Sequence, residues 1–191
     1  MKKILLSFAV IAIFFMCNYT YSYPEQTSFK SNAATSPTAQ VASLVEKLVM
    51  ADTKQSKKIL AEIDSIRREN PENTDILLMY ANSLIGEKQY KQGINSLRAL
   101  YEKKPIRTYL LTQCMLKERL GNKDKSCYDE VVHLSEQKDL IDSDYITALF
   151  FSDTDKFKSV KKQLIKKKEV KKSDFLIYTL GQKEMLHELF P

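Results

Sequence analysis

The stretch that decides the fold is Thr74–Pro105, TDILLMYANSLIGEKQYKQGINSLRALYEKKP. Its apolar residues recur every three or four positions, which predicts one amphipathic helix over Ile76–Ile85 and a second over Gln89–Lys103. Thr74 is the expected N-cap of the first helix, and Gly86–Lys88 the turn between the two. Each helix has an apolar stripe, which neighbouring segments must bury.

The helical pattern continues on both sides of this hairpin, from Ala39 to Pro191. The 191-residue chain has only four glycines, and none of them follows Asn or Asp, so the usual β-hairpin signal is missing. Asn70-Pro71 ends an earlier helix, because the residue before a proline is driven out of the α region. Pro105 follows Pro71 by 34 residues. We therefore expect an all-α fold with an internal repeat.

Apolar stripes predict three further helix pairs around the central one. The first pair lies between Val41 and Pro71. The later stripes are Leu110, Leu111 and Cys114 with Cys127, Val131 and Leu134, then Ala148 and Phe151 with Phe157, Val160 and Leu164. Ser173 or Asp174 is expected to cap a last helix that reaches Phe190.

The central hairpin resembles a tetratricopeptide repeat, whose unit is 34 residues long. The large, small and aromatic positions of that family are matched by Leu77, Tyr80, Ala81, Leu84, Tyr90, Gly93, Leu97, Leu100 and Pro105. Leu77 stands where the family favours Trp, and Leu100 is larger than its usual Ala. The resemblance implies a right-handed α-solenoid of about four hairpins with a C-terminal capping helix, over residues 39–191.

The N-terminus is typical of an export signal. Lys2 and Lys3 precede an apolar run, Ile4–Cys17, which is too short for a permanent membrane span. We expect cleavage before Tyr23, which removes residues 1–22, and a flexible polar leader over residues 23–38. A lipoprotein anchored at Cys17 is the alternative, although Met16 fits that signal poorly, and an uncleaved N-terminal anchor is a further one.

Two cysteines remain after removal of the signal, Cys114 and Cys127. The repeat alignment places them near the two small positions that face one another where the helices of one unit pack most closely. An exported protein also meets an oxidising environment. The resemblance therefore implies a Cys114–Cys127 disulfide, with two buried thiols as the alternative.

A lysine run occupies the fourth helix pair. Apolar residues interleave with it at helical spacing, so most of the lysines are expected to face water. This surface is either a solvated outer face or a site for an anionic partner such as membrane headgroups or an acidic protein. The candidates are Lys158, Lys161, Lys162, Lys166, Lys167 and Lys168.

The sequence lacks the patterns of catalysis. His133 and His187 are the two histidines, and neither lies in a metal-binding or hydrolase motif. We expect no enzyme activity, no metal and no cofactor. The formal charge of +6 falls to +4 without Lys2 and Lys3, which is too mild for a dedicated nucleic-acid binder.

The family resemblance also implies which residues line a concave binding face on the first helix of each unit. These are Asp75, Leu78, Asn82, Ile85, Thr108, Leu111, Met115 and Glu118, with Arg119 beside them. We therefore expect a non-enzymatic protein of the bacterial envelope that binds a protein partner there, as a scaffold or chaperone for a surface or secretion structure. The alternative is a peripheral membrane or envelope protein that acts through its lysine-rich face. We expect a periplasmic location, with membrane-anchored and secreted forms as alternatives.

Overall fold

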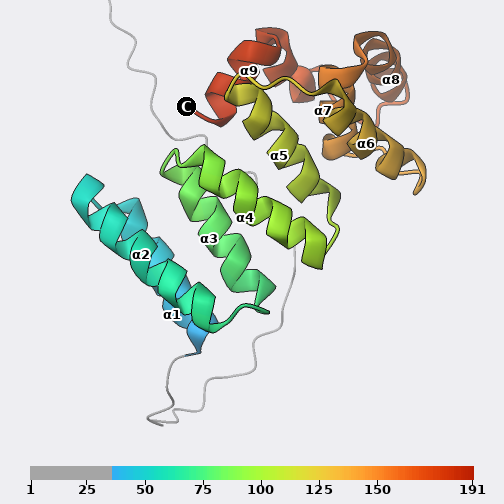
Figure 1. Ribbon diagram of the computed structural model, residues 1–191. Helices are drawn as coiled ribbons and strands as arrows, with labels where there is room; N and C mark the ends of the chain where they lie inside the picture. The colour runs from blue at the N-terminus through green and yellow to red at the C-terminus, as the bar shows by residue number, and fades with distance from the viewer. Residues whose placement is uncertain (1–35) are drawn as a thin grey trace, which may run out of the picture. The chain divides into compact units, whose positions relative to one another are not determined.

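The computed structural model describes residues 36–191, and this part of the chain is helical without strands. The signal segment, Cys17 and most of the expected leader lie outside the described residues. The helices, shown in Figure 1, are α1 Pro37–Val49, α2 Thr53–Glu69, α3 Thr74–Gly86, α4 Tyr90–Lys103, α5 Arg107–Arg119, α6 Lys125–Glu136, α7 Ser143–Ser152, α8 Thr154–Lys166 and α9 Gln182–Leu189. Two short 3₁₀ turns, η1 Lys172–Phe175 and η2 Ile177–Leu180, precede α9.

Helix starts follow local capping chemistry. Asp52 caps α2 with a capping box, in which its side chain accepts from the Gln55 backbone N–H while the Gln55 side chain accepts from the Asp52 N–H. The N-cap of α3 is Asn73 and not Thr74, because the Asn73 side chain accepts from two backbone N–H groups of the first turn. Helix α1 begins at Pro37 with Ser36 as its cap, so residues 37 and 38, expected in the leader, belong to this helix.

Successive helices pack as pairs: α1 with α2, α3 with α4, α5 with α6, and α7 with α8 (Figure 1). Each pair also contacts the next through its second helix, and the first helices meet at α1–α3 and α5–α7. The all-α class and the consecutive helix pairs expected from the sequence are therefore present.

The central pair α3–α4 is joined by a close approach at a glycine. A Cβ built on Gly93 would lie 2.8 Å from Cγ1 of Ile85 and 3.8 Å from the carbonyl oxygen of Ala81. Ala81 itself is fully buried. Small side chains at these two positions let the helices pack tightly, which explains why they stand out in the sequence.

The corresponding place in the next pair holds a disulfide. Cys114 on α5 and Cys127 on α6 are bonded, with their Cα atoms 5.7 Å apart. Both cysteines are buried in the main core. The bond implied by the repeat alignment is thus present, and it links the two helices covalently.

The buried apolar side chains of residues 36–191 form three clusters. One large cluster runs from α3 to α9, and two smaller clusters lie between α1, α2 and α3. Helix α3 belongs to both regions, because Leu77 and Ala81 join the large cluster while Ile76 and Leu84 join the smaller ones. This helix therefore connects the first pair to the rest of the domain.

The C-terminal segment differs from the expectation of one helix from Ser173 or Asp174 to Phe190. Asp174 caps only the short turn η1, where its side chain accepts from the Lys171 backbone N–H at 2.9 Å. Gly181 has φ +87° and ψ 163°, a conformation that no helix contains. The segment therefore forms two 3₁₀ turns, breaks at Gly181 and continues as α9, which packs against α5.

Candidate interaction surfaces

The expected binding residues of α3 lie on a partly open face. Asp75 and Asn82 are exposed, whereas Leu78 and Ile85 are half-buried and pack against the main core. The carboxylate of Asp75 adds to the larger effect of burial in raising the pKa of Tyr109 on α5.

Of the binding residues expected on α5, the first is exposed and the next two are buried. Thr108 is exposed, and its hydroxyl donates to Asp144 Oδ2 at 2.6 Å. Leu111 and Met115 are only 3% and 8% exposed, because α4, α6, α7 and α9 all pack against α5. These two side chains are therefore part of the core, and the exposed members of the expected set are Asp75 and Asn82 on α3 and Thr108 in the first turn of α5.

The end of α5 is occupied by the chain's own C-terminal segment. Arg119 Nε donates to the carbonyl oxygen of Phe190 at 2.7 Å, and the Tyr90 hydroxyl donates to that of Pro191 at 2.5 Å. The Arg119 guanidinium also lies 5.9 Å from the centre of the Tyr90 ring. Arg119, expected to meet a partner, is thus engaged inside the molecule.

Glu118 lines an open pocket of ≈ 340 Å³ between α5 and α9, together with Arg119, Lys123, Lys183 and His187 among others. Its Oε1 lies 3.4 Å from Lys123 Nζ, while its Oε2 is buried without a hydrogen-bond partner among residues 36–191. The pocket mixes a carboxylate with several cations, and it pairs no nucleophile with a base. We assign it no chemical role.

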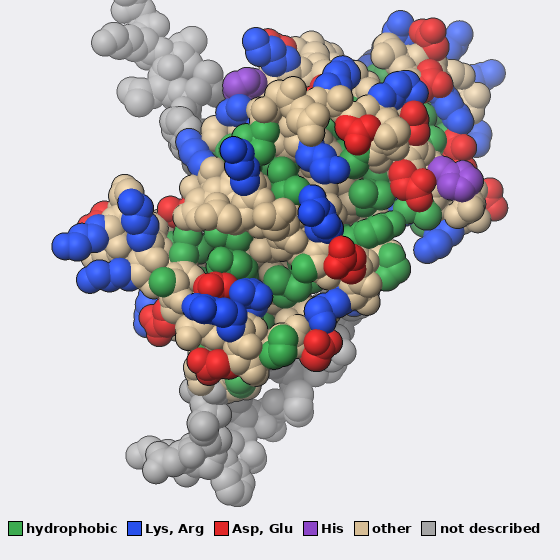
Figure 2. Space-filling model, in the orientation of Figure 1, with side chains coloured by type: hydrophobic (Ala, Val, Ile, Leu, Met, Phe, Trp, Pro, Cys, Tyr) green, Lys and Arg blue, Asp and Glu red, His purple; other side chains and the backbone are tan. Residues whose placement is uncertain are grey.

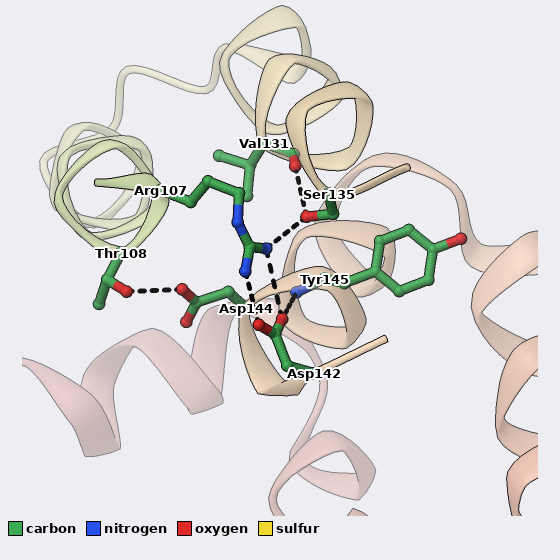
Figure 3. A network of polar contacts seen from close by, with 7 residues as sticks. All are labelled: Arg107, Thr108, Val131, Ser135, Asp142, Asp144 and Tyr145. Atoms are coloured by element: carbon green, nitrogen blue, oxygen red, sulfur yellow. Dashed lines mark hydrogen bonds and ion pairs between the residues drawn. The ribbon is translucent and has the colours of Figure 1, made fainter. Parts of the chain in front are cut away.

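A polar network joins α5, α6 and α7 (Figure 3). Arg107 Nη2 lies 2.5 Å from Asp142 Oδ2, and its Nη1 donates to Ser135 Oγ, which in turn donates to the carbonyl oxygen of Val131 at 2.7 Å. Asp142 also caps α7 by accepting from the Tyr145 backbone N–H at 3.1 Å. The network fixes the start of α5 against the start of α7, next to Thr108.

The charges of this network stabilise one another. The hydrogen bond to Asp142 is the main cause of the raised pKa of Arg107. Partial burial pushes the pKa of Asp142 upward, but the hydrogen bonds from Arg107 and from the Tyr145 backbone outweigh it, so the pKa is lowered. Sequence reasoning missed Arg107, because its partners lie 28 and 35 residues away and leave no local pattern.

The lysine-rich face lies on α8 and the turn after it, where basic side chains gather over this part of the molecule (Figure 2). Phe157 and Leu164 are buried, which turns the opposite side of α8 to solvent. Lys158, Lys162, Lys166, Lys167 and Lys168 are exposed as expected. The remaining candidate, Lys161, is half-buried, with Nζ 5.0 Å from the centre of the Phe175 ring.

Lys156, at the start of α8, forms an ion pair within the protein. Its Nζ lies 2.5 Å from Glu136 Oε1, which also accepts from the Tyr145 hydroxyl at 2.9 Å. The hydrogen bond from Lys156 is the main cause of the lowered pKa of Glu136. This lysine therefore links α6 to α8 and is not part of the free cationic face.

The described residues contain no group of three or more His, Cys, Asp or Glu that could hold a metal ion. In residues 36–191 no helix is both long and apolar enough to cross a membrane.

Residues 36–191 therefore form an all-helical domain in which consecutive helices pack together and a disulfide joins α5 to α6. Comparison with protein-family models, with curated proteins and with solved structures found no match. The function is therefore inferred from the exposed surfaces.

Proposed function

We propose that this chain is a non-enzymatic protein–protein interaction module of the bacterial envelope, a scaffold or chaperone in the assembly of a surface or secretion structure. Its helix pairs would stack as the right-handed solenoid of tetratricopeptide-like repeats. The first helices of such a stack form an inner surface that receives a peptide or a partner helix.

The exposed face of α3 is the observation that carries this proposal. Asp75 and Asn82 present polar groups to solvent, and Leu78 and Ile85 stay half-buried between them. An amphipathic partner helix buries apolar anchors and satisfies polar groups at the rim. The mixture on α3 suits such a ligand better than a lone charged group.

Export to an oxidising compartment is part of the proposal. The Cys114–Cys127 disulfide and the signal-like N-terminus both favour it, because disulfides persist outside the reducing cytosol. We propose a periplasmic location, with membrane-anchored and secreted forms as the alternatives.

The proposal is tested by affinity capture from the envelope fraction of the producing cells, using Asn82→Arg. A long cation on the inner face should abolish capture of the specific partner. Asn95→Arg is the matched control, because Asn95 is an exposed asparagine on α4, away from that face. Capture of the same protein by both variants, or its loss from both, would overturn the assignment to α3.

The lysine-rich face supports a second candidate function, a peripheral envelope or membrane-associated protein. The specific observation is that five exposed lysines crowd one side of α8 and its C-terminal turn. Such a surface attracts anionic partners over distances of about the Debye length.

A further inference from the structure

The net positive charge of the chain comes from one short segment. Residues 155–172 contain nine lysines and two carboxylates, a net charge of +7, while the whole chain carries +6. The rest of the protein is therefore close to neutral, at −1. The excess of positive charge is therefore local to α8 and the turn after it. A net charge that served only solubility would be spread over the whole surface.

Few of these lysines are neutralised. Besides Lys156, Lys158 lies 3.4 Å from Asp155 and Lys167 lies 3.7 Å from Glu169. The others make no salt bridge with any residue that the structure describes; they are Lys161, Lys162, Lys166, Lys168, Lys171 and Lys172. The uncompensated charge lies on the surface of one helix and its C-terminal turn.

Two exposed leucines follow this lysine-rich segment in the chain. Leu176 is 65% exposed and Leu180 is 45% exposed. The ring of Phe175 lies 6.2 Å from that of Phe157 on α8 and beneath Lys161 Nζ. Leu176 follows Phe175 directly, so its backbone lies close to α8.

We propose that this surface, α8 with the η1–η2 turns, binds an anionic phospholipid membrane. The lysines attract the headgroups, and Leu176 and Leu180 enter the interface between headgroups and acyl chains. The inference deepens the second candidate function, on which it rests, and it is independent of the inner face of α3.

The residue type favours a membrane over an acidic protein. Residues 155–172 contain no arginine, although arginine's planar fork is the better match for fixed carboxylates. Lysine is a hydrated point charge on a flexible stem, which suits a fluid array of phosphates. Exposed leucines beside it add the apolar contact that electrostatic attraction alone does not provide.

The absence of tryptophan from the chain gives a direct test, because Leu176→Trp introduces a single tryptophan, whose emission is distinct from that of the ten tyrosines. The chain without residues 1–22 is used, which retains the whole described core and keeps the apolar run Ile4–Cys17 away from the vesicles. Vesicles that contain phosphatidylglycerol should shift the emission to the blue, and pure phosphatidylcholine vesicles should not. Val49→Trp, at a position 79% exposed on α1, is the matched control and should not shift.

Charge reversal supplies the second measurement. Lys162→Glu, Lys166→Glu and Lys172→Glu together should lower vesicle partitioning by more than about tenfold, as should raising the salt concentration with the unreversed chain. The same reversal of Lys54, Lys57 and Lys58, exposed on α2, should change it far less. The proposal would be overturned if the two triple variants lost vesicle binding equally, or if the emission of Leu176→Trp did not shift. Binding that does not depend on phosphatidylglycerol would also overturn it. Asn82→Arg should bind vesicles normally, which separates this result from the test of the inner face.

Discussion

Arg107 shows how a single side chain fixes three helices. It begins α5, reaches Ser135 on α6 and pairs with Asp142 at the cap of α7. The guanidinium side chain is 13% exposed and the carboxylate side chain 43%. Because the pair is only partly screened from water, its contribution is moderate and depends on both groups remaining charged.

Asp142→Asn should remove the charge and retain the helix cap, since asparagine is a good N-cap. The lowered pKa of Asp142 means that its stabilisation is present above the unfolded-state pKa and is lost as pH falls through the folded-state value. We expect the variant to lose about 1 kcal/mol at about pH 7 and little at about pH 2. Urea denaturation at both pH values measures this difference.

Asp144→Asn is the matched control for that experiment, because Asp144 lies in the first turn of the same helix. Its carboxylate accepts a hydrogen bond from the Thr108 hydroxyl, and an asparagine side chain can accept the same hydrogen bond. It should cost less at neutral pH. A loss at Asp142 that is the same at neutral and acid pH would contradict the ion-pair account.

Single residues were predictable where a pattern surrounds them. The repeat alignment placed Cys114 and Cys127 at facing positions, and the disulfide is present. Arg107 was not predictable, because its role depends on partners brought together by three helices. Leu111 was expected both in an apolar stripe and on the binding face, and Met115 on the binding face alone; both are buried. Helix periodicity does not reveal how many neighbours surround a helix.

At the scale of helices, the approach of α3 to α4 depends on Gly93 and Ile85. A methyl group at residue 93 would meet Ile85 Cγ1 at 2.8 Å, which is too close for packed carbon atoms. Alanine also has better helix propensity than glycine, by about 1 kcal/mol. The two effects oppose one another, and the clash should prevail in the native background.

Gly93→Ala should therefore destabilise the protein by about 1 kcal/mol. Ile85→Ala removes this contact and leaves the Ala81 carbonyl oxygen, at 3.8 Å, as the nearest atom, so in that background the same change should become stabilising. A double-mutant cycle by thermal or urea denaturation reports this reversal of sign. Additive effects would show that Ile85 does not set the helix approach.

Helix pairs were easier to predict than the C-terminal segment. The stripes of α3 and α4 follow a regular period, and both helices form within a few residues of the expected bounds. The segment after Lys172 has apolar residues at helical spacing too, but Gly181 adopts φ +87° and Asp174 caps a short turn. A glycine within a helical pattern does not reveal which backbone conformation it takes.

At the scale of the whole domain, the C-terminal segment determines which surfaces remain open. Phe190 and Pro191 contact Tyr90 and Arg119, and α9 packs on α5. Of the residues that the sequence assigned to a binding face on α3 and α5, those left exposed lie on α3 and at the start of α5. The cationic face on α8 is separate from these residues in the sequence and in its charge.

The central claim is that α3 receives a protein partner, and photo-crosslinking in the producing cells tests it most directly. A photo-reactive amino acid in place of Asn82 should give a discrete higher-mass adduct, whereas the same amino acid in place of Asn95 on α4 should give none. Absence of an adduct at residue 82, or the same adduct from both positions, would contradict the claim.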